Sequence, residues 1–106
     1  MKTYEEKLQY LNEYFNSSYE NLNEINWYDI STSKKLNEDF IREFQNKVCW
    51  NSISEYQKLS EDFIREFQDE VNWHLISIHQ KLSEDFIREF KDKVSWNSIL
   101  KYQKIK

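Results

Sequence analysis

Residues 58–80 read KLSEDFIREFQDEVNWHLISIHQ, and nearly the same 23 residues stand on either side. Residues 35–57 read KLNEDFIREFQNKVCWNSISEYQ and residues 81–103 read KLSEDFIREFKDKVSWNSILKYQ, so three units align without gaps. Self-similarity at a fixed period of roughly 20 to 50 residues marks repeat architectures, because each unit buries its apolar face against its neighbours. The sequence therefore predicts a tandem-repeat protein.

The remaining residues complete a single domain over 1–106. Residues 17–34 form a degenerate unit that keeps Trp27 and Ile30 in register with the later copies. Residues 104–106 read as the truncated start of a further unit. Residues 1–16 fall outside the pattern and predict an N-terminal capping helix. One face of that helix is expected to carry Tyr4, Leu8, Leu11 and Phe15.

Each unit carries two helix signals. In the middle copy Ser60 stands before two acids, which is the pattern of a helix N-cap. Asn72 repeats the signal just before Trp73, and Asn26 and Ser95 occupy the same place in other units. The apolar residues after Ser60 recur at helical spacing: Leu59, Phe63, Ile64, Phe67 and Val71. We therefore expect a longer helix, a tight connection and a shorter helix in each unit.

These signals predict an all-α solenoid, in which longer and shorter helices alternate and the Phe, Trp and Ile columns form the core. The sequence contains no Gly and no Pro, the residues that usually form β-turns. A leucine-rich repeat has a similar period but requires a repeated LxL strand, which the units lack.

Composition narrows the classes of function. The net charge of −4 disfavours general nucleic-acid binding, which depends on Lys and Arg neutralising phosphates. Cys49 is the only cysteine, so no internal disulfide can form. The charged N-terminus does not resemble a signal peptide, and no apolar run approaches the ~18 residues of a membrane span. We expect a cytoplasmic protein with no contact to membranes.

No residues are arranged for catalysis, for a cofactor or for a metal. Cys49 aligns with the helix caps Asn72 and Ser95, and no His or acid is fixed near it as a base. His74 and His79 are five residues apart and point in different directions on a helix, unlike the i, i+4 pair of a zinc helix. His79 stands where other units have tyrosine, which suggests an aromatic at the edge of the core. The protein is therefore predicted not to be an enzyme.

Arg42, Arg65 and Arg88 form a ladder and are the only arginines. A ladder of this kind could grip phosphates, which would make the protein a nucleic-acid-binding repeat. However, a glutamate precedes each arginine by four residues, in the favourable order for an ion pair within a helix. We expect these local pairs: Glu38–Arg42, Glu61–Arg65 and Glu84–Arg88. Similarly, Glu43 and Glu89 are expected to face Lys47 and Lys93.

The middle unit differs from its neighbours in a way that suggests a partner-binding site. His74, Leu75 and Ile78 replace polar or charged residues of the sister units, and His74 and Ile78 share the outer face of the predicted helix. Exposed apolar residues that cluster beside an aromatic column are candidates for partner contact. The same unit has the most acidic flank, with Glu66 facing Glu70 and Asp69 nearby. These six residues form the predicted site.

The segment KLSEDFIREF, followed by VxW and IS or IL, resembles a tandem-repeat family of phages, large DNA viruses and mobile elements of AT-rich bacteria. The resemblance covers residues 35–106 and implies a helical repeat without catalytic residues. It favours a non-enzymatic protein-binding module that inhibits a host protein, such as a CRISPR effector or another antiviral nuclease. Two alternatives remain: the nucleic-acid binder described above, and a self-assembling repeat that pairs as a homodimer.

Overall fold

The computed structural model describes residues 2–103, and every regular element in that range is helical. The expected all-α class is confirmed. The predicted truncated unit, 104–106, lies outside the described residues. The helices, in chain order, are α1 (Tyr4–Phe15), the 3₁₀ turn η1 (Leu22–Glu24), α2 (Trp27–Ser33), α3 (Glu38–Glu43), α4 (Trp50–Tyr56), α5 (Glu61–Glu66), α6 (Trp73–His79), α7 (Glu84–Glu89) and α8 (Trp96–Tyr102).

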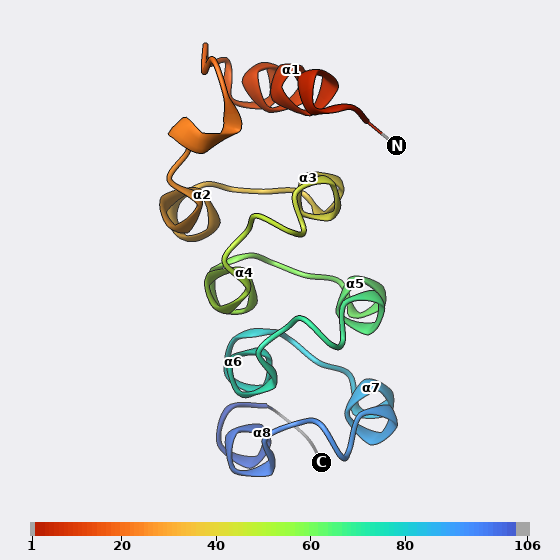
Figure 1. Ribbon diagram of the computed structural model, residues 1–106. Helices are drawn as coiled ribbons and strands as arrows, with labels where there is room; N and C mark the ends of the chain where they lie inside the picture. The colour runs from red at the N-terminus through yellow and green to blue at the C-terminus, as the bar shows by residue number, and fades with distance from the viewer. Residues whose placement is uncertain (1, 104–106) are drawn as a thin grey trace.

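The helices form two parallel columns (Figure 1). Helices α2, α4, α6 and α8 pack on one another in sequence, and α1, α3, α5 and α7 form the second column. Each 23-residue unit adds one helix to each column, so the molecule is elongated, with extents of 50 × 25 × 17 Å. The arrangement is the helical solenoid that the repeat predicted. None of the described helices combines the length and the apolar character needed to cross a bilayer.

The expected difference in helix length is wrong. Helices α3, α5 and α7 have six residues each, whereas α4, α6 and α8 have seven. The first helix of the middle unit ends at Glu66, and the chain continues in hydrogen-bonded turns to Val71, whose N–H donates to the Phe67 carbonyl at 3.1 Å. Both Phe67 and Val71 are buried. The apolar spacing was therefore informative about burial, but it could not distinguish helix from successive turns.

The core lies between the two columns. Phe63, Ile64 and Ile76 are fully buried in the middle unit, and each buried side chain of this size contributes about 1.5–3 kcal/mol. The tryptophans lie at the edge of this core. Trp50 is half-buried and packs against the next unit, with 5.2 Å between its ring centroid and that of Phe67. Trp96, in the last unit, remains 44% exposed.

The predicted N-caps are confirmed at most positions. Ser60 Oγ accepts a hydrogen bond from the Phe63 N–H at 3.1 Å, and Asn72 Oδ1 accepts one from the Leu75 N–H at 3.1 Å. Ser95 occupies a cap position but makes no side-chain cap bond. Its hydroxyl instead donates to the Ser98 hydroxyl at 3.0 Å.

A glutamine at the end of each full unit ties that unit to the one before it, and it is buried in the first two of them. Gln80 Oε1 accepts the Leu59 N–H at 3.1 Å, while Gln80 Nε2 donates to the carbonyls of Ser54 (3.0 Å) and Gln57 (2.7 Å). Gln57 and Gln103 make the equivalent bonds in their own units. Backbone groups that the stacking removes from water are thereby satisfied. The sequence analysis did not predict this glutamine ladder.

A row of serines makes a second set of bonds between units. Ser54 Oγ accepts the N–H of Asn72, and Ser77 Oγ accepts that of Ser95, both at 3.0 Å. Ser31 makes the equivalent bond in the degenerate unit. In the last unit this position is Leu100, which is 69% exposed and cannot accept a hydrogen bond. Leu100 therefore cannot make the hydrogen bond that the serines make at this position.

Helix α1 covers the first full unit, as the capping prediction required. Leu11 is fully buried, whereas Tyr4, predicted on the same face, is 52% exposed. Two tyrosines outside the predicted face contribute more. Tyr10 packs near Phe40, at 6.1 Å between ring centroids, and the Tyr14 hydroxyl accepts the Asn37 N–H at 2.9 Å. The cap thus supplies both apolar cover and a hydrogen-bond acceptor.

Candidate partner-binding face

The two columns of helices differ sharply in charge. Each of α3, α5 and α7 has the sequence EDFIRE, with four charged residues in six. In contrast, α2, α4, α6 and α8 contain only Asp29, Glu55 and Lys101 as Asp, Glu, Lys or Arg residues. The charged helix residues are therefore concentrated on one side of the solenoid, and the helices of the other side are nearly uncharged.

Aromatic and apolar side chains occupy the outer surface of this uncharged column. Tyr28, Tyr56 and Tyr102 are 60%, 56% and 51% exposed. His74 and His79 are also exposed, whereas Leu75 and Ile78 are half-buried. We define the aromatic face as these seven residues: Tyr28, Tyr56, His74, Leu75, Ile78, His79 and Tyr102. His79, interpreted as an aromatic at the edge of the core, has a side chain that is 36% exposed, and the equivalent Tyr56 and Tyr102 extend further into solvent.

Contacts between successive helices join the aromatic face into one surface. His79 Nε2 lies 3.8 Å from Glu55 Oε2, which connects α6 to α4. His74 Nδ1 lies 3.5 Å from the Ser98 hydroxyl, which connects α6 to α8. The two histidines of the middle helix α6 therefore contact the helices on either side of it.

Two hollows lie where these helices end. The first has a volume of 490 Å³ and lies between Tyr56 and His79. The second has a volume of 370 Å³ and lies between His79 and Tyr102. His79, Gln80 and Lys81 line both hollows, so the two are adjacent. The aromatic face is thus not flat, and the hollows at the C-terminal ends of its helices could receive side chains of a partner.

The six residues of the predicted site divide into two groups. His74, Leu75 and Ile78 all lie on α6, in the middle of the aromatic face. The acidic residues belong to the other column: Glu66 ends α5, and Asp69 and Glu70 lie in the turns that follow. Ile78 is less exposed than its position on a helical wheel suggested, because it lines the second hollow beside Tyr102.

Two of the three acidic residues, Glu66 and Asp69, are engaged by the charged column itself. Arg42 Nε donates to the Glu66 carboxylate at 2.9 and 3.1 Å, and Lys93 Nζ lies 3.7 Å from Asp69 Oδ1. The prediction that Glu66 faces Glu70 is wrong for the same reason, since stacking directs Glu66 toward the preceding unit. These acids are therefore less available to a partner than the sequence suggested.

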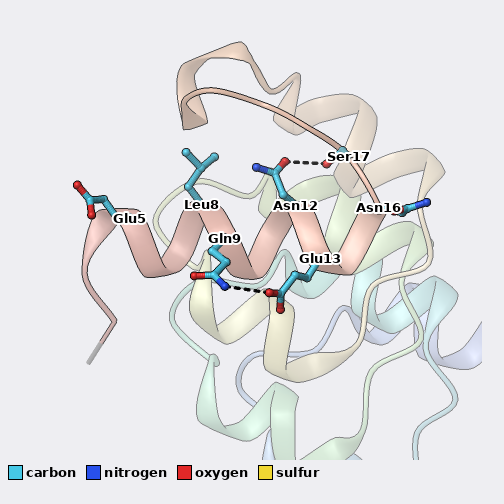
Figure 2. A pocket seen from close by; sticks show the side chains of 7 residues that line it. All are labelled: Glu5, Leu8, Gln9, Asn12, Glu13, Asn16 and Ser17. Atoms are coloured by element: carbon cyan, nitrogen blue, oxygen red, sulfur yellow. Dashed lines mark hydrogen bonds between the residues drawn. The ribbon is translucent and has the colours of Figure 1, made fainter.

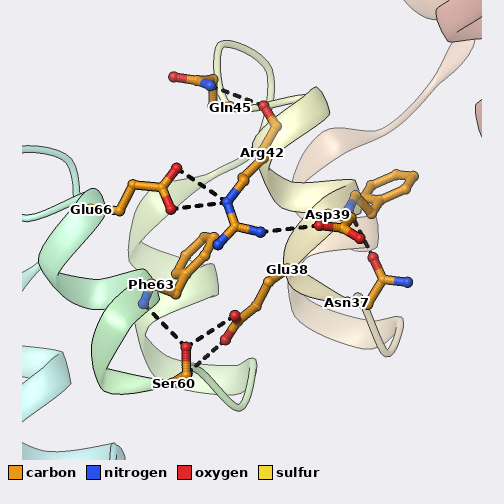
Figure 3. Close-up of polar contacts among 9 residues, drawn as sticks. Asn37, Glu38, Asp39, Arg42, Gln45, Ser60, Phe63 and Glu66 are labelled. Carbon is orange, nitrogen blue, oxygen red and sulfur yellow. Dashed lines mark hydrogen bonds and ion pairs between the residues drawn. The ribbon is translucent and has the colours of Figure 1, made fainter.

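Two arginines of the ladder, Arg42 and Arg65, join neighbouring units, and Figure 3 shows the contacts of Arg42. The Arg42 guanidinium lies over the Phe63 ring at 5.3 Å while it pairs with Glu66, and Arg65 pairs with Glu89 in the same way at 2.7 and 2.8 Å. Glu38 accepts both the N–H (2.7 Å) and the hydroxyl (3.0 Å) of Ser60. Stacking thus gives Arg42 and Arg65 each a carboxylate from the next unit, in addition to the aspartate three residues earlier in the same helix.

The expected local ion pairs are correspondingly corrected. The pairs Glu38–Arg42 and Glu61–Arg65 are replaced by contacts between units, and only Arg88 pairs with the glutamate four residues earlier, Glu84, at 3.6 Å. The expected pairs Glu43–Lys47 and Glu89–Lys93 are also wrong. Glu43 instead pairs with Lys2 at 2.8 Å, and Glu89 pairs with Arg65.

Acid should weaken the contact between Arg65 and Glu89. The Arg65 guanidinium lowers the pKa of the Glu89 carboxyl. A lowered folded-state pKa stabilises the fold above the ordinary glutamate value of about 4.3, and this contribution disappears as the pH falls through the lowered pKa. We expect Glu89→Gln to reduce the melting temperature at about pH 7 and to have a smaller effect at about pH 3. Thermal melts followed by circular dichroism test this.

Glu70→Gln is the matched control for that variant, because Glu70 is exposed and lies in the turns after α5. Its melting temperature should follow wild type at both pH values. If Glu89→Gln destabilises the protein equally at both, the pair with Arg65 does not account for the effect, and a packing role for Glu89 replaces it.

The remaining candidate groups make local contacts. A hydrogen bond with the Ser52 side chain lowers the pKa of the Cys49 thiol, with 3.6 Å between Sγ and Oγ. A hollow of 500 Å³ lies along α1 (Figure 2), but its amides are used locally, as in the bond from Gln9 to Glu13 at 3.0 Å. Within residues 2–103 no group of three or more His, Cys, Asp or Glu residues is placed to hold a metal ion.

Comparisons of the chain with models of protein families, with curated proteins and with solved structures find no match.

Proposed function

We propose that the protein is a non-enzymatic protein-binding repeat module whose partner docks on the aromatic face. The observation that carries this proposal is the separation of charge between the two columns. One side of the solenoid displays three exposed tyrosines. The helices on that side have only three charged residues: Asp29, Glu55 and Lys101. Depletion of charge and enrichment of aromatic residues distinguish the centres of protein interfaces from ordinary surface.

The geometry of the face suits protein recognition. Tyrosine offers a large, rigid contact surface at a low cost in conformational entropy, and it frequently provides much of the binding energy at interfaces. The face follows a column that runs along the 50 Å axis of the molecule. A surface of that length can supply the ~800 Å² per partner of a standard interface.

The nucleic-acid alternative is less well supported by the position of the arginines. Arg42 and Arg65 are each held by two carboxylates, one in the same helix and one in the next unit. Phosphate binding would have to compete with those pairs. This alternative predicts an affinity that falls steeply with salt, whereas docking mainly through aromatic and apolar side chains predicts a shallower salt dependence.

As the target class we propose host antiviral nucleases, including CRISPR effectors, inhibited in the cytoplasm of the host cell. The resemblance of the KLSEDFIREF motif to phage and viral repeats supports this choice, together with the small size and net charge of −4. Purified nucleases of this class should lose DNA cleavage activity when roughly one equivalent of the protein is added, as expected for a tight one-to-one complex.

The double variant Leu75→Ala with Ile78→Asp tests the face. Both residues are half-buried on α6, and the new carboxylate would be desolvated under a docked partner. We expect the variant to require roughly tenfold more protein for half-inhibition of the nuclease. The control is Gln45→Ala with Lys47→Asp, which changes exposed residues after α3 in the charged column.

Circular dichroism must show the same helical content for both double variants. If the α6 variant inhibits as well as wild type, the aromatic face is not the docking surface. If neither the wild-type protein nor the control variant inhibits any of the purified antiviral nucleases at micromolar concentration, the target class is wrong.

A further inference from the structure

The two hollows at the edge of the aromatic face repeat with the period of the sequence. Their walls are formed by equivalent residues of successive units, because Tyr56, His79 and Tyr102 are 23 residues apart. The same holds for Lys58 and Lys81. We call the combined hollow the trough, lined by Tyr56, Lys58, His79, Lys81 and Tyr102. A ligand lying along it would meet an aromatic ring and a lysine in each unit.

The groups that could recognise a ligand lie on the rim of the trough. At its floor Leu59 and Leu82 are buried, and the side-chain amide of Gln80 is already used in three hydrogen bonds. On the rim, Lys58 and Lys81 are exposed. The one carboxylate, Glu55, lies 3.8 Å from His79. The rim therefore offers ammonium groups and aromatic rings in alternation.

We propose that the trough binds an extended peptide segment of the partner, with acidic side chains paired to Lys58 and Lys81 and apolar side chains between the aromatic rings. The inference rests on the proposed function and specifies the partner chemistry. The trough is locally basic in a chain of net charge −4, so it complements an acidic segment. The rings beside the lysines supply apolar contact area for the intervening residues.

The repeat also sets the spacing of the acidic side chains. Packed helices lie about 8–10 Å apart, and an extended peptide advances about 3.3 Å per residue. One unit of the solenoid therefore corresponds to about three peptide residues. Acids three positions apart match this spacing and point to the same side when the segment adopts the extended polyproline II conformation, which has three residues per turn, so they should reach Lys58 and Lys81 together. Acids two positions apart span only about 6 Å in that conformation and point to different sides, so they fall short.

A single-stranded nucleic acid fits the trough less well. Glu55 would repel phosphates, and two lysines neutralise too few of them for strong binding. Peptide carboxylates need to occur only where the lysines are, whereas phosphates occur at every nucleotide.

Fluorescence anisotropy with the full chain and labelled ten-residue peptides tests the proposal. The peptides carry two glutamates separated by two, three, four or five positions on a leucine and serine background. Lysine-substituted versions and a ten-nucleotide oligo-dT serve as further probes. We expect the spacing of three to bind most tightly. The double variant Lys58→Glu with Lys81→Glu should bind this peptide roughly tenfold more weakly than wild type, and it should bind the lysine-substituted peptide more tightly than the glutamate peptide.

The control is Lys47→Glu with Lys91→Glu, which makes the same change in net charge in the turns after α3 and α7. Its affinity for the peptide should stay within about twofold of wild type, because the lysines are distant from the trough and screened by salt. Equal affinity for all spacings, equal weakening by the control, or no binding to any peptide would overturn the proposal. Tighter binding of oligo-dT than of every peptide would also overturn it.

The nuclease assay separates this inference from the proposed function. If the α6 variant loses inhibition and Lys58→Glu with Lys81→Glu retains it, the trough is wrong and the aromatic face stands. If both variants inhibit like wild type, both proposals fail. If both lose inhibition, and the charge-reversed variant also prefers the lysine peptide, both are supported.

Discussion

Gln80→Ala should lower the free energy of unfolding by about 3–5 kcal/mol, because it leaves three backbone groups without their partner. These groups are the Leu59 N–H and the carbonyls of Ser54 and Gln57, which the Gln80 amide binds at 3.1, 3.0 and 2.7 Å. Gln80 is only 5% exposed, so water reaches them poorly. Such a loss is a large part of the roughly 5–15 kcal/mol that stabilises a domain of this size. Equilibrium urea denaturation followed by tryptophan fluorescence measures it.

Two other glutamines provide matched controls. Gln45 also donates a hydrogen bond to a carbonyl, that of Arg42 at 3.0 Å, but it is exposed, so Gln45→Ala should cost less than about 1 kcal/mol. Gln103 makes the same three bonds as Gln80 but is half-buried in the last unit, so its loss should be intermediate. If Gln80→Ala and Gln45→Ala cost the same, the glutamine ladder does not stabilise the stacking.

The glutamine ladder shows where sequence analysis reaches its limit. The helix class, the period and the caps at Ser60 and Asn72 follow from local rules, and the structure confirms them. The bonds of Gln80 join residues 21 to 26 positions apart. Predicting them requires the geometry of stacking. The only available signal was the recurrence of a polar residue at Gln57, Gln80 and Gln103, which recent duplication would also produce.

The arginine ladder illustrates the same limit from the opposite side. A glutamate four residues before Arg42 predicts an ion pair within the helix, and that rule considers only neighbours in sequence. In the solenoid a second carboxylate, that of Glu66, arrives from the next unit at 2.9 Å. Glu38 is then directed to Ser60 instead. Local rules therefore identified the charged surface correctly but assigned its partners wrongly.

The candidate site was only partly accessible to sequence analysis for a related reason. Substitution in the middle unit identified His74, Leu75 and Ile78, which lie in the centre of the aromatic face. It did not identify Tyr56 and Tyr102, because tyrosine is the usual residue at that position of the repeat and was interpreted as an aromatic at the edge of the core. Their exposure of 56% and 51% became evident only once the direction of stacking was known.

Phe63→Ala should lower the free energy of unfolding by about 3–5 kcal/mol, the usual cost of removing a buried phenylalanine ring. Phe63 has no exposed surface, and its ring centroid lies 4.7 Å from that of Phe67 and 6.2 Å from that of Trp50 in the preceding unit. The cavity would therefore weaken both the middle unit and its contact with the unit before it. In a solenoid, stability is the sum of such units and their interfaces.

Tyr56→Ala is the control for Phe63→Ala, because it removes a ring of similar size from a position that is 56% exposed. It should change the free energy of unfolding by less than about 1 kcal/mol. The contrast between the two variants depends on neighbouring units covering each other's rings, so it tests the stacking directly. Equal losses for the two would mean that Phe63 is not enclosed by its neighbours. The aromatic face would then lose the rigid column on which Tyr56, His79 and Tyr102 are aligned.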